Sequence, residues 1–160
     1  MTLIDELLAA NEDAPRPDTR GAPPARKLAV VTCMDARIVV GTVLGLRLGD
    51  AHVIRNAGGR VTDDVLRSLA LSSGTLGVET VVVMQHTKCG LENVTDAELR
   101  ERTGADLEFL PIADHAASLR ADIERLTDAP YLSQLRTIAG LLYDVESGRV
   151  DRVIQWERPG

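Results

Sequence analysis

The sequence predicts an α/β fold: a mostly parallel central β-sheet flanked by helices, with a C-terminal antiparallel edge hairpin and an N-terminal helical arm. Two observations carry this prediction. Three short segments are almost wholly apolar, as strands buried on both faces of a sheet are. Stretches with helical apolar spacing lie between them, and such alternation indicates a parallel sheet with helices on its faces.

The N-terminal arm comes first along the chain. Residues 2–11 carry leucine and isoleucine at helical spacing opposite acidic side chains, and Thr2 is the expected N-cap. Residues 15–24 contain four prolines, which exclude a helix or a central strand and predict an extended spacer. Because a helix this short is marginal in water, it must dock on the domain or on another subunit. We therefore divide the chain into an arm, residues 1–26, and a single α/β domain, residues 27–160.

The domain is expected to contain strands, helices and one closing hairpin. Its strands are expected at residues 27–33, 51–56, 79–85, 137–144 and 149–155, the last two forming the hairpin. Its helices are expected at residues 38–48, 63–76, 95–102 and 112–127. Gly41, Gly45 and Gly49 recur every four residues in the first of these helices and directly after it, and we expect them to permit close packing.

Composition and charge exclude several classes of protein. The chain has 160 residues and a mass of 17.3 kDa, enough for one domain that buries a core without disulfides. Aromatic residues make up only 2%, so the core must consist of Leu, Val, Ile and Ala. A net charge of −6 without a basic cluster argues against a nucleic-acid partner. No apolar run reaches ~18 residues and the N-terminus is acidic, so we expect no membrane span, no secretion signal and a cytoplasmic location.

The two cysteines lie where a ligand site is expected. Cys33 ends the first strand, and Cys89 follows the third strand, three residues after His86. The carboxyl ends of neighbouring parallel strands meet at one edge of a sheet, where ligands bind. Two thiolates and one imidazole suit zinc, and three protein ligands leave the fourth position open, as in a catalytic site. The alternatives are two buried apolar cysteines or a disulfide, and the missing secretion signal disfavours the disulfide.

Asp35 and Arg37 strengthen the metal hypothesis. If the chain stays extended beyond Cys33, residues 33, 35 and 37 share one face. A carboxylate near the metal can accept a hydrogen bond from zinc-bound hydroxide, but only while it is ionised. Arg37 would keep Asp35 ionised and oriented through a bidentate pair. The alternative interpretation is an ordinary ion pair in a loop.

Three motifs resemble those of the β-class carbonic anhydrases, in the wording of the compact prokaryotic branch. They are C-M-D-A-R at 33–37, H-V-I-R-N-A-G-G at 52–59 and H-T-K-C-G at 86–90. The resemblance spans residues 27–90, and residues 143–148 are also similar. Cys33 and His86 stand 53 positions apart; it is the combination of the C-x-D-x-R and H-x-x-C motifs that is specific.

The resemblance implies a zinc lyase that hydrates carbon dioxide reversibly to bicarbonate and a proton. It implies that Cys33, His86 and Cys89 hold Zn²⁺ and that Asp35 and Arg37 form the catalytic dyad. It also implies a homodimer or a higher homo-oligomer, in which the N-terminal helix embraces the partner subunit. Carbon dioxide and bicarbonate would be its small-molecule partners.

The resemblance leaves alternatives open. In some members the aspartate replaces water on the metal in acid, and a tryptophan supports a bicarbonate pocket; here that position is Val30, although Arg55 matches the pocket's arginine. We therefore expect an open resting site, with Asp35 as a ligand only in a closed state. The same scaffold could instead hydrolyse carbonyl sulfide or carbon disulfide. A non-catalytic zinc-stabilised or regulatory domain is a third possibility, against which the intact pair of Asp35 and Arg37 argues.

Other polar residues are given structural roles. Residues 56–59 are expected to form a tight turn that lets the backbone approach the metal cleft, with Arg55 bracing it. His52 is expected to support its strand and His115 to lie on a solvated helix. The charged side chains of residues 120–128 are likewise expected on a solvated helix face.

Overall fold

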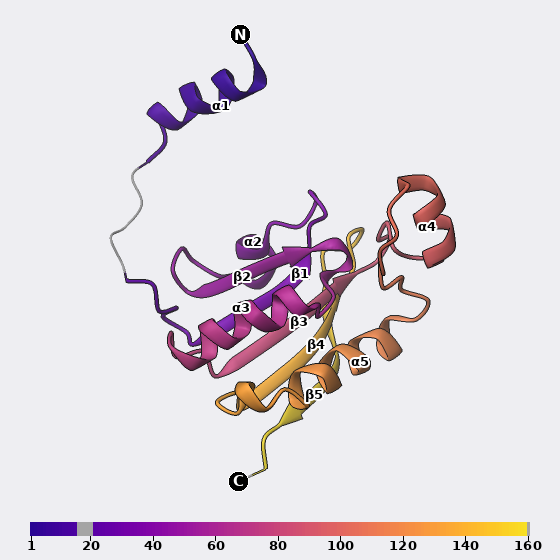
Figure 1. The fold of residues 1–160 in the computed structure, drawn as a ribbon. Coiled ribbons are helices and arrows are strands. Elements are labelled where there is room, and N and C mark those ends of the chain that lie inside the picture. Colours follow the sequence, from indigo (N-terminus) through magenta and orange to yellow (C-terminus); the bar gives the residue numbers. More distant parts are fainter. Residues whose placement is uncertain (16–20, 160) are drawn as a thin grey trace.

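A five-stranded sheet forms the centre of the protein (Figure 1). The structure, a computed structural model, describes residues 1–15 and 21–159. The strands are β1 (Leu28–Cys33), β2 (Ala51–Asn56), β3 (Thr80–His86), β4 (Thr137–Tyr143) and β5 (Val150–Glu157), in the spatial order β2-β1-β3-β4-β5. The first four run parallel, and β5 pairs antiparallel with β4 at one edge. The predicted fold class and its edge hairpin are confirmed.

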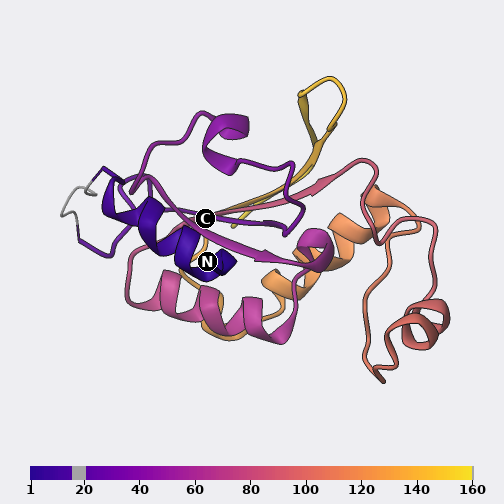
Figure 2. The ribbon, with the colours of Figure 1, turned by 90° about the horizontal axis from the view of Figure 1, so that it is seen from above.

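Helices cover the two faces of this sheet unequally. They are α1 (Leu3–Glu12), α2 (Val40–Leu44), α3 (Asp63–Gly74), α4 (Asp96–Thr103) and α5 (His115–Thr127), with 3-10 turns η1 (Ala57–Gly59) and η2 (Pro130–Leu132). Figure 2 shows α3 and α5 on one face and the short α2 on the other. No helix in the described part of the chain is long and apolar enough to cross a membrane.

The main core lies between the sheet and the two long helices. As the scarcity of aromatic residues predicted, it consists mostly of aliphatic side chains, among them Leu69 on α3 and Leu119 on α5. Gly140 on β4 lets α5 come close, because a Cβ atom there would lie 3.2 Å from Cβ of Leu119. This packing holds the sheet in place from one face. The carboxyl edge of the sheet lies outside this core and can therefore carry polar side chains.

The register of the parallel strands aligns their carboxyl ends. Cys33 at the end of β1 pairs with Asn56 at the end of β2, and Thr32 pairs with Met84 of β3. β3 continues to His86, two residues beyond that pair. The ends of β1, β2 and β3 therefore meet at one edge of the sheet.

The helix expected at residues 38–48 is much shorter than predicted. Only Val40–Leu44 is helical, because Gly45 takes the left-handed conformation (φ 64°) and its N–H bonds to the carbonyl of Gly41, which ends the helix. A Cβ atom on Gly41 would lie 3.0 Å from the Leu46 carbonyl oxygen, so close packing is confirmed there. At Gly45 the space is open, and φ is positive at both Gly45 and Gly49, so these two glycines serve the backbone conformation instead.

The N-terminal helix has no residue buried against the described part of the chain. The Thr2 side chain accepts from the Asp5 N–H while Asp5 caps the Thr2 N–H, so the expected N-cap is confirmed as a full capping box. None of the α1 residues is buried, and the helix stands apart from the sheet in Figure 1. Part of the expected spacer, residues 16–20, lies outside the described residues. Ala25 and Arg26 already donate to the carbonyls of Gly49 and Asp50, and the domain division at residue 26 stays a prediction.

Truncating the core under α5 should cost much of the stability. Leu119 is fully buried, so Leu119→Ala should lower the free energy of unfolding by about 2–5 kcal/mol through lost apolar burial and a cavity. Chemical denaturation at a fixed protein concentration measures the change. Leu107→Ala is the control, because that side chain is 59% exposed and should change stability by less than about 0.5 kcal/mol. Equal effects of the two substitutions would contradict this packing.

Candidate metal centre

Cys33, His86 and Cys89 converge at the carboxyl edge of the sheet. One possible ligand atom from each lies within 4.8 Å of the others, and all three residues are buried. The two sulfur atoms are 4.0 Å apart. Tetrahedral coordination at Zn–S bonds of about 2.3 Å requires a sulfur separation of about 3.8 Å. The predicted cluster therefore forms, with a spacing that fits a zinc ion.

The ring of His86 is oriented for metal binding. Its Nδ1 lies 2.9 Å from the carbonyl oxygen of Thr87. Because a carbonyl only accepts, Nδ1 carries the proton and Nε2 is left with a lone pair. Nε2 is buried and has no hydrogen-bond partner among residues 1–15 and 21–159. A buried acceptor without a partner, beside two sulfur atoms, fits the role of a metal ligand.

The surroundings of Cys33 favour its thiolate. The pKa of this thiol is lowered to about 4, chiefly because Cys89 donates to its sulfur, and the backbone N–H groups of Asp35 and Gly58 add to the effect. The pKa of the neighbouring Cys89 is raised, since its proton is shared with Cys33 and burial disfavours a second charge. A cation between the two sulfurs would relieve that repulsion, and a metal-bound thiol is deprotonated.

Asp35 and Arg37 meet beside the cluster. Arg37 binds the carboxylate in a bidentate manner, Nε to Oδ1 at 2.9 Å and a terminal nitrogen to Oδ2 at 2.7 Å. This guanidinium holds the pKa of Asp35 well below its usual range. Oδ2 of Asp35 also lies 3.8 Å from Nε2 of His86. The pair therefore presents an ionised carboxylate next to the possible metal position.

A turn, not an extended strand, brings this pair together. β1 ends at Cys33, the Ile38 N–H donates to the Asp35 carbonyl at 3.0 Å, and the Arg37 N–H donates to Asp35 Oδ1 at 2.9 Å. The expectation that residues 33, 35 and 37 lie along one strand face was wrong. A side chain that caps its own turn replaces the strand geometry.

Two arginines tie this turn to its surroundings. Arg55 donates to the carbonyls of Cys33 at 2.9 Å and Asp35 at 2.7 Å. Arg37 donates to the carbonyl of Lys88 at 3.0 Å. Sequence analysis placed Arg55 against the glycine turn; the structure shows that it braces the segment between Cys33 and Asp35 instead.

The glycine turn approaches the cluster as expected. Gly59 has φ 65°, and a Cβ atom there would lie 2.8 Å from the backbone nitrogen of Cys33. The side chain of Asn56 closes the turn through the N–H and the carbonyl of Arg60, at 2.9 and 2.8 Å. The missing side chain at Gly59 thus allows backbone to pack directly against the end of β1.

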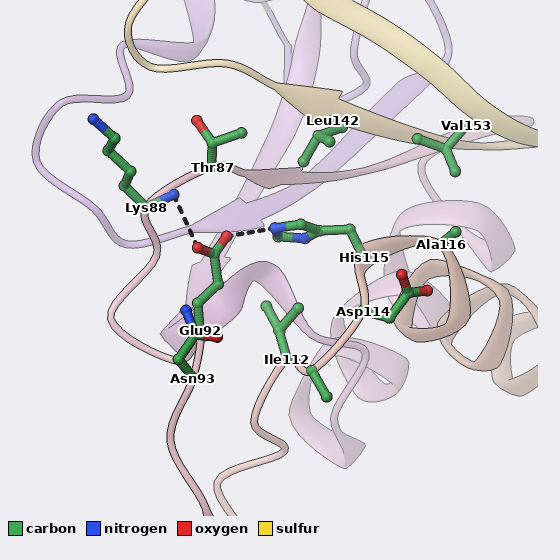
Figure 3. Close-up of a pocket in the computed structure, with 11 residues that line it drawn as sticks. Thr87, Lys88, Glu92, Asn93, Ile112, Asp114, His115, Ala116, Leu142 and Val153 are labelled. Carbon is green, nitrogen blue, oxygen red and sulfur yellow. Dashed lines mark hydrogen bonds and ion pairs between the residues drawn. The ribbon is translucent and has the colours of Figure 1, made fainter.

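The surroundings of one histidine differ from those predicted. His115 was expected on a solvated helix, but its ring contacts Glu92 and Gln85, at 2.5 and 2.8 Å (Figure 3). The prediction failed because residues 93–114 fold back and bring the start of α5 to the loop that follows β3 and carries Cys89, here called the metal loop. No local pattern in the sequence indicates this path. His52 supports its strand as expected, through Ser72 and the Ala22 carbonyl.

One charged residue of α5 is buried, although the helix face was predicted to be solvated. Residues 120–128 were expected on a solvated face, but Asp122 is buried. It binds the guanidinium of Arg60 at 2.8 Å and accepts from the Val61 N–H at 3.2 Å. This buried pair fixes α5 against the segment that follows the glycine turn.

Comparisons with known proteins agree with this geometry. The profile of the carbonic anhydrase family matches residues 28–116. Beta-carbonic anhydrase 1 of Mycobacterium tuberculosis (strain H37Rv) is 36% identical in an alignment of 165 positions, which covers 96% of this chain and 99% of that protein. The crystal structure of a carbonic anhydrase from Streptococcus mutans superposes with a TM-score of 0.86 at 41% identity, over 96% and 99% of the two chains. A carbon disulfide hydrolase of Acidithiobacillus thiooxidans is 33% identical over 81% of this chain and 78% of its own length.

Metal analysis tests the centre directly. The purified protein should contain about one zinc ion per chain, since the described residues include one cluster of three possible ligands with tetrahedral spacing. Cys89→Ala should lose the metal and unfold at a lower temperature, because removing one ligand weakens binding that stabilises the folded state. Elemental analysis with a thermal melt measures both. A folded wild-type protein that contains no metal would contradict this centre.

Proposed function

As this chain belongs to the β class of the carbonic anhydrase family, we propose that it catalyses the reversible hydration of carbon dioxide to bicarbonate and a proton. One observation carries the proposal: an arginine-paired carboxylate, Asp35, lies beside a buried Cys₂His cluster with tetrahedral spacing. A metal that only stabilises the fold has no use for an ionised acceptor beside it.

Cys33, His86 and Cys89 are proposed as the zinc ligands. When bound, the zinc ion makes a water molecule acidic enough to supply hydroxide near neutral pH. The hydrogen bonds of the chain prepare these ligands: the Thr87 carbonyl holds the His86 tautomer, and backbone N–H groups favour the Cys33 thiolate. Three ligands leave room for the reacting group.

Asp35 is proposed to orient the nucleophile. An ionised carboxylate only accepts hydrogen bonds, so Asp35 would accept one from the reacting hydroxide, without taking its proton, and would thereby orient a lone pair toward carbon dioxide. Arg37 keeps the carboxylate ionised, and Arg55 holds the backbone of the turn in place. Because Asp35 is already paired with Arg37, its position supports the open resting site expected from the sequence. The proton released in the reaction leaves to solvent.

A second candidate function comes from the sulfur analogues of carbon dioxide. The similarity to a carbon disulfide hydrolase favours it, and the Cys₂His cluster and the pair of Asp35 and Arg37 would suit either substrate. The relative and the solved structure whose alignments cover nearly all of both chains are carbonic anhydrases. Hydration of carbon dioxide is therefore the leading proposal.

We further propose that the protein acts as a cytoplasmic homodimer. α1 exposes four apolar side chains, each more than half exposed: Leu3, Ile4, Leu7 and Leu8. Beside α2 and the start of β2 lies a mostly apolar hollow in which Leu48 and Val53 are exposed. A second copy would cover both surfaces, and a short helix gains stability only by such packing. Zinc binding requires two reduced thiols, which suits the cytoplasm.

Removing the acceptor should stop catalysis without removing the metal. Asp35→Asn should lower carbon dioxide hydration by at least roughly 10- to 100-fold, because the neutral amide loses the charged pair with Arg37 and can donate instead of accept. Stopped-flow hydration and zinc content measure the two effects. Asp64→Asn, which breaks the exposed pair of Asp64 and Arg67 on α3, is the matched control. Unchanged hydration in Asp35→Asn would refute the role of the dyad, and wild-type protein that only releases hydrogen sulfide from carbonyl sulfide would favour the second candidate.

Charging the apolar face of α1 should separate the subunits. Ile4→Glu with Leu8→Glu places two carboxylates where apolar contact is expected, so the mass in solution should fall from dimer to monomer. Light scattering coupled to size exclusion gives the mass. Glu6→Gln, on the acidic side of the helix, should leave it unchanged. A dimer that survives the double substitution would show that α1 does not hold the subunits together.

A further inference from the structure

Glu92 and His115 form a pair that the proposed reaction does not use. His115 is the first residue of α5, and Glu92 lies three positions after Cys89. Oε1 of Glu92 lies 2.5 Å from Nε2 of His115, with the side chains 22% and 18% exposed. Figure 3 shows the Glu92 carboxylate between the histidine ring and the backbone of Lys88. A pair so shielded is screened by solvent less than an exposed surface pair.

The other oxygen of Glu92 holds the backbone of the metal loop. The N–H of Lys88 donates to Oε2 at 3.1 Å. Lys88 has φ 56°, a left-handed conformation that residues with a Cβ atom rarely adopt. The backbone N–H of Glu92 also donates to the carbonyl of Cys89 at 3.0 Å. Glu92 therefore closes, at two points, the loop on which Cys89 sits.

The same histidine reaches the strand that carries another proposed ligand. Nδ1 of His115 lies 2.8 Å from Oε1 of Gln85, which is fully buried and directly precedes His86. The Ile112 N–H donates to the Leu91 carbonyl at 2.8 Å and fixes the end of the loop. The Lys88 N–H, at the start of the loop, is held by the Glu92 carboxylate. One ring on α5 thus links the end of β3 to the loop of Cys89.

We propose that His115 is a positioning residue for the zinc centre. It holds the Glu92 carboxylate against the Lys88 N–H and so keeps the Cys89 sulfur where the ion needs it. His115 acts through Glu92 and Lys88, not on the metal or the substrate. This inference rests on the proposed function, since it takes the bound ion to be held by Cys89. Losing such an outer contact typically weakens metal binding about 10- to 100-fold.

Zinc release from the full-length holoenzyme to a chromogenic chelator tests this inference. His115→Ala should release zinc about 10- to 100-fold faster than the wild type, because the Glu92 carboxylate loses its support. Glu92→Ala should do the same. Glu92→Gln keeps an oxygen that can accept from Lys88, so it should release zinc much more slowly than Glu92→Ala. The double variant should be no faster than Glu92→Ala alone, since both side chains act on one loop.

His52→Ala is the matched control. The ring of His52 also has both nitrogens bonded, to Ser72 and to the Ala22 carbonyl, but it lies near the amino end of β2. This variant should lower the melting temperature of the metal-free protein without speeding zinc release. The inference would be overturned if His115→Ala released zinc at the rate of the wild type, or if His52→Ala released it as fast as His115→Ala. Either result would leave the proposed function standing. A wild-type protein that takes up no zinc would overturn both.

Discussion

The parallel pairing of β1 with β3 places the metal centre, and the rest of the site is built on that register. Thr32 lies opposite Met84, and its hydroxyl donates to the Met84 carbonyl at 2.8 Å, one residue before Cys33. Side chains alternate between faces along a strand, so a slip of one residue would turn Cys33 to the wrong side of the sheet. The close packing of α3 and α5 on the opposite face makes such a slip costly.

Charge balance explains the arrangement around this edge. Two buried sulfur atoms and the nearby Asp35 carboxylate would leave excess negative charge in a site that water reaches poorly. Arg37 balances the carboxylate through its bidentate pair, and a divalent cation would balance two thiolates. Such a centre is formally neutral, which suits a small uncharged substrate. Backbone N–H groups at Asp35 and Gly58 add hydrogen bonds to sulfur, and the absence of a side chain at Gly59 brings that turn close enough.

The sequence was most informative where chemistry depends on strand periodicity. Cys33, His86 and Cys89 stand at or just after strand ends, and the common edge of a parallel sheet suffices to bring them together. The existence of the five strands and of the closing hairpin also follows from local patterns, whereas their spatial order comes from the structure. The alternation rule failed after Cys33, because the Asp35 side chain caps its own turn and ends the strand geometry.

Contacts that depend on tertiary folding could not be read from the sequence. Arg55 binds two carbonyls that only the fold brings near it. His115 and Asp122 looked like ordinary polar positions on an exposed helix, but the path of residues 93–114 covers most of the His115 ring and the packing of α5 buries Asp122. The early end of α2 is a local example. The helical spacing of apolar residues continues to residue 48, but the left-handed conformation of Gly45 ends the helix.

The most direct test of this account measures carbon dioxide hydration by the full-length protein before zinc removal, after chelation and after zinc is returned. Stopped-flow mixing with a pH indicator gives the rate in each state. We expect fast hydration that disappears with the metal and recovers with added zinc, while the chain stays folded. Hydration that persists without zinc, or none in the zinc-loaded protein, would contradict the assignment.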